Sequence, residues 1–477
     1  MPETQNNKVI LHTKEWQPRT YAPVASAAGY FVVNDNANQA RFAMYMNLAA
    51  TPYLYDHEQD DWLPLTASAL APAIAAGACG CYSDWSIPFI ANGGSTTTVT
   101  VPAATYNING LVVGKTIEFT NSSNIGLRRT ITAILNLGGS GNTTLTFDSP
   151  VTAVVNTDTF RIASGSFWIL TTGTLTTTSF KQFDLATMAW VSKAITGLPA
   201  WGTDARLVHP GMLGVSYETG TAAVTSSSTT IDCTGKTWTV DQWINYQVRV
   251  TGGTGIGQIR VITDNDADTL TFASMSPAPD ATSTFVIEGD EDAIYALGNG
   301  AVTLYKYSII GLTWATVSPS AARAGAPIAG MSANFVGVTG DTGWADATNI
   351  KNGRYIYSLR GGTSVIDRYD IALKAWVATT GLVYTPSLLT FATGDSTDWS
   401  GKYIYIAKEG TGQIPQRFYA FSVVDNVMTP VTTDWNLGGA ALLGNKIWIK
   451  NLSTAGTVKW LYCLQSTSVV VKRIMLF

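Results

Sequence analysis

One short unit recurs along this chain and constrains its fold more than any other feature. It consists of an aromatic residue, a polar residue directly after it, and a large apolar residue six positions further on. The clearest copy follows an apolar strand and a Gly-Gly pair. We call the first and third residues of each copy its marker pair. The six copies, of which the fifth is degenerate and the sixth, with Leu in place of the aromatic residue, is weaker still, are Tyr55, Asp56, Trp62; Phe183, Asp184, Trp190; Tyr307, Ser308, Trp314; Tyr369, Asp370, Trp376; Phe421, Ser422, Met428; and Leu464, Gln465, Val471.

Each copy predicts the same local structure. A strand ending near small residues precedes it, and the aromatic and polar residues end the next strand. The polar side chain is expected to cap the turn that follows. The third residue then packs back over the strand, against a neighbouring sheet. A hairpin this small cannot bury its own apolar face, so the recurrence predicts units that stack on one another.

The copies are spaced unevenly, by 128, 124, 62, 52 and 43 residues. Two segments, 93–165 and 221–289, account for the wide gaps, and they are copies of each other. Residues in the first segment match residues 131 positions later in the second, and TLTF at 144–147 matches TLTF at 269–272. We predict two homologous inserts, each a small β-barrel or sandwich of about five strands. The matched residues are Thr120, Gly126, Arg129, Ile131 and Thr132 with Thr251, Gly257, Arg260, Ile262 and Thr263.

The composition agrees with an all-β chain. Charged residues make up 13% of it, about half the usual share, and Gly, Ser and Thr are abundant in their place. This balance favours short strands and Gly-rich turns, and it also suits a protein with extensive interfaces. The Lys and Arg residues form no clusters, so we expect no direct sequence-specific contact with nucleic acid. The one helical candidate, the Ala-rich run 68–76, is broken by Pro72.

The first residues of the chain and the four cysteines indicate in which compartment the protein is made. Residues 1–20 read as an extended N-terminal arm, which either frays or becomes ordered on a partner. We expect no signal peptide, because the start MPETQNNK is polar, and we expect four reduced cysteines in a protein made in the cytoplasm. The longest weakly polar stretch, 67–82, is too short to span a bilayer.

The repeated unit resembles the kelch repeat of β-propellers, most closely where Gly361 and Gly362 precede the marker pair Tyr369 and Trp376. Most copies lack an intact Gly-Gly, and the last two lack Trp. The resemblance implies four-stranded blades around an axis, with six blades expected and five or seven as alternatives. We therefore predict an all-β, kelch-like β-propeller that carries two insertions. Its parts are the propeller at 21–92, 166–220 and 290–477, and the inserted modules at 93–165 and 221–289.

The inserts are similar to modules of tailed-bacteriophage structural proteins. The second insert carries the pattern in three parts, and the first keeps the scaffold without the Trp residues and the Gln. The resemblance implies a virion protein. The three parts of the pattern are Trp238, Val240, Asp241, Gln242 and Trp243; Gly255, Gly257 and Gln258; and Ser283, Thr284, Phe285 and Ile287.

Segments with possible chemistry are better interpreted as structure. His57, among acidic residues, fits a solvated turn better than a metal site, and Cys79 and Cys81 lack further zinc ligands. The loop 252–258 lacks the Lys-Ser/Thr of a phosphate loop, so we expect a hairpin. The acidic stretches 264–268 and 289–293 lack the alternating ligands of a calcium loop. We predict no catalytic, cofactor-binding or metal-binding residue.

The sequence thus predicts a non-enzymatic structural component of a tailed-bacteriophage virion, in the tail or nozzle, the neck or the head. It would act as an assembly scaffold, as a homo-oligomer in contact with other virion proteins. One alternative is an attachment protein that binds host-surface glycans through its 15 Trp and 20 Tyr residues. A less favoured alternative is a polysaccharide-degrading enzyme acting at the propeller mouth.

Overall fold

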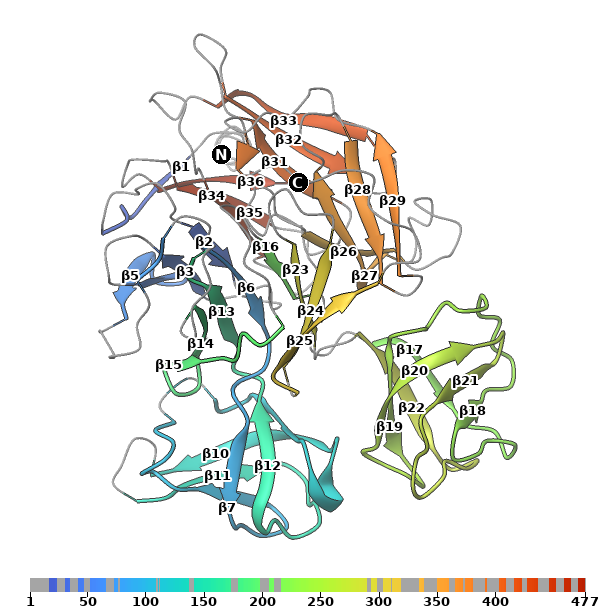
Figure 1. Ribbon diagram of the computed structural model, residues 1–477. Coiled ribbons are helices and arrows are strands. Elements are labelled where there is room, and N and C mark those ends of the chain that lie inside the picture. Colours follow the sequence, from blue (N-terminus) through green and yellow to red (C-terminus); the bar gives the residue numbers. More distant parts are fainter. Residues whose placement is uncertain are drawn as a thin grey trace, which may run out of the picture.

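The described residues of this computed structural model form antiparallel β-sheets with one short 3-10 helix, η1 (Ser122–Asn124), and no α-helix (Figure 1). The prediction of an all-β chain is therefore confirmed. Among these residues no helix is long and apolar enough to cross a membrane. The described residues are 17–23, 31–34, 42–46, 52–65, 73–75, 78–108, 110, 112–136, 141–172, 179–197, 206–209, 216–289, 293–297, 303–309, 311–318, 334–338, 350–359, 365–371, 374–380, 391–392, 403–408, 416–422, 427–435, 446–451, 459–464 and 471–476.

Six sheets have four strands each, and neighbouring strands of a sheet follow one another along the chain apart from the inserts and the N-terminal strand. The first strands of four of these sheets lie near one another, because β2 contacts both β6 and β34, and β6 contacts β16. In order, the sheets are β2 (Phe31–Asn34), β3 (Phe42–Met46), β4 (Tyr53–Asp56), β5 (Asp61–Pro64); β6 (Cys79–Ser83), β13 (Ser166–Leu170), β14 (Phe180–Asp184), β15 (Ala189–Ser192); β16 (Arg206–Val208), β23 (Ala293–Leu297), β24 (Leu304–Ser308), β25 (Thr313–Val317); β26 (Asn334–Val338), β27 (Ile350–Leu359), β28 (Val365–Asp370), β29 (Ala375–Thr380); β30 (Phe391–Ala392), β31 (Tyr403–Lys408), β32 (Gln416–Ser422), β33 (Val427–Trp435); and β34 (Lys446–Asn451), β35 (Lys459–Leu464), β36 (Val471–Leu476), β1 (Gln17–Arg19).

All six marker pairs are cross-strand neighbours. In each sheet the two members lie directly opposite each other on the third and fourth strands, or on β35 and β36 in the sixth sheet. The polar residue between them caps the turn where the turn is described. Asp56 accepts hydrogen bonds from the amides of Glu58 and Gln59, Asp184 from that of Thr187, and Ser308 from that of Gly311.

The first four marker pairs also hold neighbouring sheets together, all in the same direction, whereas the sixth pair, Leu464 and Val471, lies in the core between the sixth and first sheets. The pair of the second sheet packs on the first sheet, that of the third on the second, and that of the fourth on the third. The pair of the first sheet, Tyr55 and Trp62, packs on Trp460 and Tyr462 of the sixth sheet. The predicted packing of the Trp residues onto a neighbouring sheet is thus confirmed for these four copies.

The N-terminal strand belongs to the C-terminal sheet. Residues 17–19 pair antiparallel with β36, and Arg19 forms a 2.7 Å ion pair with Asp60 in the first sheet. Asp60 also accepts hydrogen bonds from the hydroxyl of Tyr55 and the amide of Thr20. The end of the predicted arm is therefore an edge strand, whereas residues 1–16 lie outside the described part.

Two further sheets have six strands each and the same strand order. We call them module 1 (residues 89–162) and module 2 (residues 216–288); the predicted insert ranges were 93–165 and 221–289. Each follows the first strand of its four-stranded sheet, the second and the third respectively, and both lie on one side of the four-stranded sheets (Figure 1). In sheet order, module 1 is β7 (Phe89–Asn92), β12 (Asn156–Ile162), β9 (Thr116–Phe119), β10 (Arg128–Leu135), β11 (Thr143–Phe147), β8 (Thr98–Val101), and module 2 is β17 (Ser216–Thr221), β22 (Thr284–Glu288), β19 (Gln247–Gly252), β20 (Ile259–Asn265), β21 (Thr269–Phe272), β18 (Thr230–Asp232).

The two modules agree strand by strand. The bulge between Ile131 and Ala133 on β10 recurs between Ile262 and Asp264 on β20. Each module has six strands where the sequence suggested about five, because β7 and β17 also join the sheets. These strands pair with the last strand of their module, about 70 residues away, so the local pattern carried no sign of the pairing.

Candidate functional site

The two modules meet through equivalent glycines. A Cβ atom on Gly126 would lie 1.6 Å from the carbonyl oxygen of Gly257, and one on Gly257 would lie 2.7 Å from that of Ile125. Both glycines have left-handed backbones, with φ of +77° and +87°. Only glycine satisfies both demands, since any side chain here would overlap the other module's backbone.

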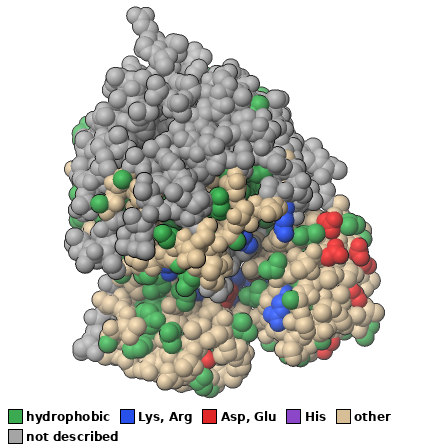
Figure 2. Space-filling model, viewed as in Figure 1, with side chains coloured by type: hydrophobic (Ala, Val, Ile, Leu, Met, Phe, Trp, Pro, Cys, Tyr) green, Lys and Arg blue, Asp and Glu red, His purple; other side chains and the backbone are tan. Residues whose placement is uncertain are grey.

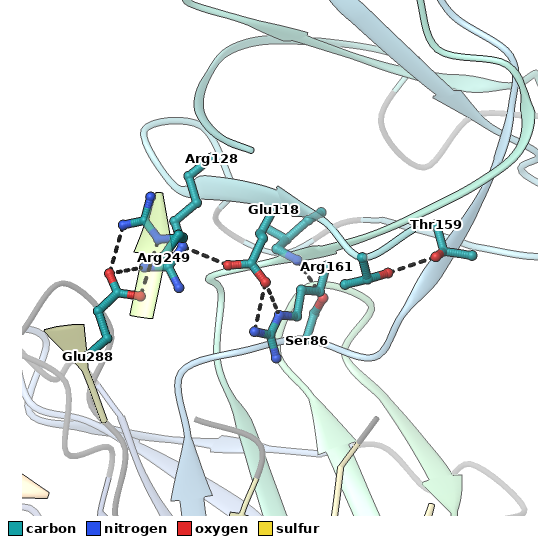
Figure 3. Close-up of polar contacts among 9 residues, drawn as sticks. Ser86, Glu118, Arg128, Thr159, Arg161, Arg249 and Glu288 are labelled. Carbon is teal, nitrogen blue, oxygen red and sulfur yellow. Dashed lines mark hydrogen bonds and ion pairs between the residues drawn. The ribbon is translucent and has the colours of Figure 1, made fainter. Parts of the chain in front are cut away.

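A buried ionic cluster lies at the same junction (Figure 3). Within module 1, Glu118 on β9 accepts hydrogen bonds from Arg128 on β10 and from Arg161 on β12. The contacts are 2.6 Å from Arg128 Nε, and 2.8 and 3.0 Å from Arg161 Nη2 and Nε. The three residues are cross-strand neighbours in the sheet, so strand register alone brings them together.

Arg128 extends the cluster into module 2. Its Nη1 lies 3.0 Å from Oε1 of Glu288, the last residue of β22. Glu288 is also held by Arg249 of its own module, through contacts of 2.7 and 3.2 Å. Arg128 thus binds one carboxylate in each module and joins them.

An aromatic ring next to the second four-stranded sheet packs against this cluster. The Trp85 ring, just after β6, lies under two guanidinium groups, with Arg161 at 4.2 Å and Arg128 at 5.3 Å from its centre. Ser86 exchanges hydrogen bonds with the end of β12, because its hydroxyl accepts from the Ile162 amide and its own amide donates to the Ile162 carbonyl. The junction therefore involves both modules and the sheet that carries module 1.

The electrostatics favour a fixed ionic junction over acid–base chemistry. Burial opposes ionisation of Glu118, but the guanidinium groups of Arg161 and Arg128 outweigh it and hold the pKa of Glu118 below its usual range. A carboxylate kept ionised in this way is a poor proton donor near neutral pH. Buried charges held by several partners position the surrounding elements instead.

Each module is also bound to the turn of one copy of the repeated unit. The Gly110 amide in module 1 donates to the carbonyl of Ala186, in the turn after Asp184. In module 2, Asn245 Nδ2 donates to the carbonyl of Ile371, in the turn after Asp370. Module 1 therefore docks on its own sheet, the second, whereas module 2 follows a strand of the third sheet and docks on the fourth.

The turn that receives module 1 contains a buried carboxyl group, that of Asp184. Burial raises the pKa of Asp184 to about 6, although hydrogen bonds from Thr187 act in the opposite direction. Its oxygens also accept a 3.3 Å hydrogen bond from the Ile87 amide, just before β7. Asp184 thus caps its own turn and holds the chain as it enters module 1.

The His and Cys residues that the sequence analysis considered as possible metal ligands are buried in the structure. His57 is buried between the rings of Tyr55 and Tyr462, so the expectation of a solvated side chain is wrong at this residue. Cys79 and Cys81 are buried in the core between the second and third sheets. Among the described residues, no group of three His, Cys, Asp or Glu side chains is placed to hold a metal ion.

The two loops of module 2 are hairpin and capping elements. The stretch 252–258 joins the antiparallel strands β19 and β20, as expected. Within 264–268, Asn265 accepts a hydrogen bond from the amide of Trp243 and donates to the carbonyl of Thr239. In the acidic stretch 289–293, residues 290–292 lie outside the described part.

The sequence reasoning missed the junction residues Trp85, Glu118, Arg128, Arg161 and Glu288. One feature of the sequence could have pointed to this junction. At the constant spacing of 131 residues, Glu118 aligns with Arg249, so the two similar strands carry opposite charges at this position.

No family model and no curated protein matches the chain. A solved structure titled "Structure of U3-55K" matches over 96% of this chain and 100% of that chain, with 8% sequence identity and a TM-score of 0.34. A likeness at this level carries no argument about function.

Proposed function

We propose that the six four-stranded sheets form a six-bladed, kelch-like β-propeller, with the modules inserted in its second and third blades. Three observations support this. The first strands β2, β6, β16 and β34 lie together, the first four marker pairs pack in one direction from sheet to sheet, and the first sheet packs on the sixth. The N-terminal strand β1 would close the ring by completing the blade that the C-terminal strands begin.

On this scaffold we propose a non-enzymatic structural role in a tailed-bacteriophage virion, in the tail, neck or head-associated parts. The observation that carries the structural role is the junction, where buried ionic residues fix two modules to each other and to the propeller. The virion assignment rests on the sequence pattern of module 2.

The outer surfaces of the modules differ, which supports contacts with different neighbours in an assembly. Leu135 and Val155 of module 1 have 63% and 55% of their surface exposed. The equivalent residues of module 2 are Asp266 and Asp280, which are also exposed. Acidic side chains gather on module 2 in Figure 2, whereas the visible face of module 1 is largely uncharged.

The described residues offer little to the glycan-binding alternative. Every Trp residue whose burial is described lies in the interior, including all four Trp residues of the marker pairs. Such residues pack sheets together and present no ring to a sugar.

The virion role is tested by immunogold electron microscopy with antibodies raised against the recombinant chain. Purified particles of the phage that encodes the chain should carry label at one defined site, and the chain should be present in their protein digest. Particles free of both label and peptide would refute the virion role. Electron-microscopy projections of the isolated protein should show a ring with one two-lobed projection formed by the paired modules. Two separate lobes, or no ring, would refute the proposed architecture.

A further inference from the structure

Contacts between the modules are nearly reciprocal. Gly126 and Gly257 are equivalent residues, and each one faces the other's hairpin. A Cβ on Gly126 would meet Ile259 of module 2, and a Cβ on Gly257 would meet Leu127 of module 1. Equivalent surfaces that face each other are the signature of an isologous, twofold-like interface.

We propose that the hairpin surface around Gly126 and Gly257 is a recognition surface whose partner is a second module of the same kind. We further propose that Arg128 and Glu288 are specificity residues that favour the unlike pair, module 1 with module 2. The inference concerns the chain itself and stands independently of the proposed virion role.

The specificity argument follows from the equivalent positions. Arg128 aligns with Ile259, and Glu288 aligns with Ala163. A twofold pair of two copies of module 1 would place Arg128 opposite Ala163, without the carboxylate of Glu288. A pair of two copies of module 2 would place the buried Glu288 opposite Ile259, without Arg128. Each like pair therefore loses the ionic contact that crosses the unlike interface, and losing one partner of a buried charge is unfavourable.

The pairing also has a mechanical consequence. Module 1 is bound to the second sheet through Ala186, and module 2 is bound to the fourth sheet through Ile371. Two modules that bind each other would therefore form one rigid unit. This unit would connect the second and fourth sheets, which have the third sheet between them.

The glycine contact can be tested in the full chain with a matched pair of variants. Gly126→Ala introduces a methyl group into the other module's backbone. Gly114→Ala, in the same module, has a similar φ of +81° but no atom within 4 Å of the added Cβ, so it reproduces the backbone strain without the overlap. The distance between spin labels at Thr132→Cys and Thr263→Cys, two exposed equivalent positions, reports how the modules are arranged.

We expect one narrow distance distribution for the parent and for Gly114→Ala, and a broadened or displaced one for Gly126→Ala. The unsubstituted chain, in which Cys79, Cys81 and Cys233 are buried, gives the labelling background. An unchanged distribution in Gly126→Ala, or an equal change in Gly114→Ala, would overturn the recognition surface.

The specificity residues are tested with the same labels. Arg128→Ile and Glu288→Ala should each broaden the distribution, and the double variant should broaden it by less than the sum of the two effects, because both changes remove the same contact between the modules. Arg129→Ile is the matched control, since Arg129 donates only to carbonyls of its own module, including Pro150. Additive effects of the two changes, or an effect of Arg129→Ile as large as that of Arg128→Ile, would refute the assignment. If Gly126→Ala fails to fold by circular dichroism, these variants decide the question.

Discussion

Glu118 and Arg249 occupy equivalent positions on the central strands β9 and β19 of the two modules and carry opposite charges. Each is bound to a partner of opposite charge, Glu118 to Arg161 and Arg249 to Glu288. Arg128 links the two pairs across the junction. One reversed charge thus allows two similar sheets to share one continuous ionic cluster.

The first prediction concerns the centre of this cluster. Glu118→Gln keeps the side-chain shape but removes the charge that Arg128 and Arg161 bind. Because these groups are largely buried, we expect the free energy of unfolding to fall by about 3–5 kcal/mol, the usual cost of leaving buried charges unpaired. Urea denaturation followed by tryptophan fluorescence measures this change. Thr132→Val, on the exposed side of β10, is the control and should change stability little; equal stability of Glu118→Gln and the parent would contradict the prediction.

The second prediction concerns pH. The pKa of Asp184 is raised by burial to about 6, from 3.8 in the unfolded chain. Between these values the folded protein keeps a proton that the unfolded chain loses, so stability decreases as pH rises from about 4 to about 6. The full effect is on the order of 3 kcal/mol. Denaturation of the parent and of Asp184→Asn between about pH 4 and 8 should show their difference in stability changing across this window and levelling off about one pH unit above the folded pKa.

A second variant tests the same carboxyl group. The Thr187 hydroxyl donates a 2.7 Å hydrogen bond to Asp184 and stabilises its ionised form. Thr187→Val should therefore move the midpoint of the pH dependence upward. Parallel pH curves for the parent, Asp184→Asn and Thr187→Val would show that Asp184 does not titrate in this range.

The third prediction concerns the N-terminal strand. Asp60→Asn preserves a residue that tolerates the positive φ of 54° but weakens the ion pair with Arg19. We expect faster amide hydrogen exchange in residues 17–20, with a loss of global stability below about 1 kcal/mol, as is usual for a partly exposed ion pair. Arg19→Met should have the same effect, and the double variant should add nothing. Unchanged exchange in both single variants would mean that pairing with β36 alone holds the strand.

The sequence allowed much of the repeated structure to be predicted, because the relevant signals are local. Six residues separate the polar residue of each copy from the large apolar residue, a spacing that fits a hairpin. The sequence alone therefore located all six marker pairs. Internal similarity likewise revealed the two modules. The contact between Arg128 and Glu288 joins residues 160 positions apart, and no spacing or periodicity encodes such a contact. The burial of His57 was missed for the same reason, since its partner Tyr462 lies at the other end of the chain.

The final prediction returns to the repeated unit. Trp376 has 6% of its surface exposed and packs with Tyr369 against the third sheet, at 5.2 Å between ring centres. Trp376→Ala should lower the free energy of unfolding by about 3–5 kcal/mol, because it removes a buried aromatic side chain and leaves a cavity. Trp376→Met should cost less, since Met428 already fills the equivalent position of the fifth sheet and an unbranched side chain can occupy part of the space. Chemical denaturation of both variants measures the difference. If Trp376→Ala left stability intact and abolished a binding activity, the unit would be a recognition element and its interpretation as sheet packing would be wrong.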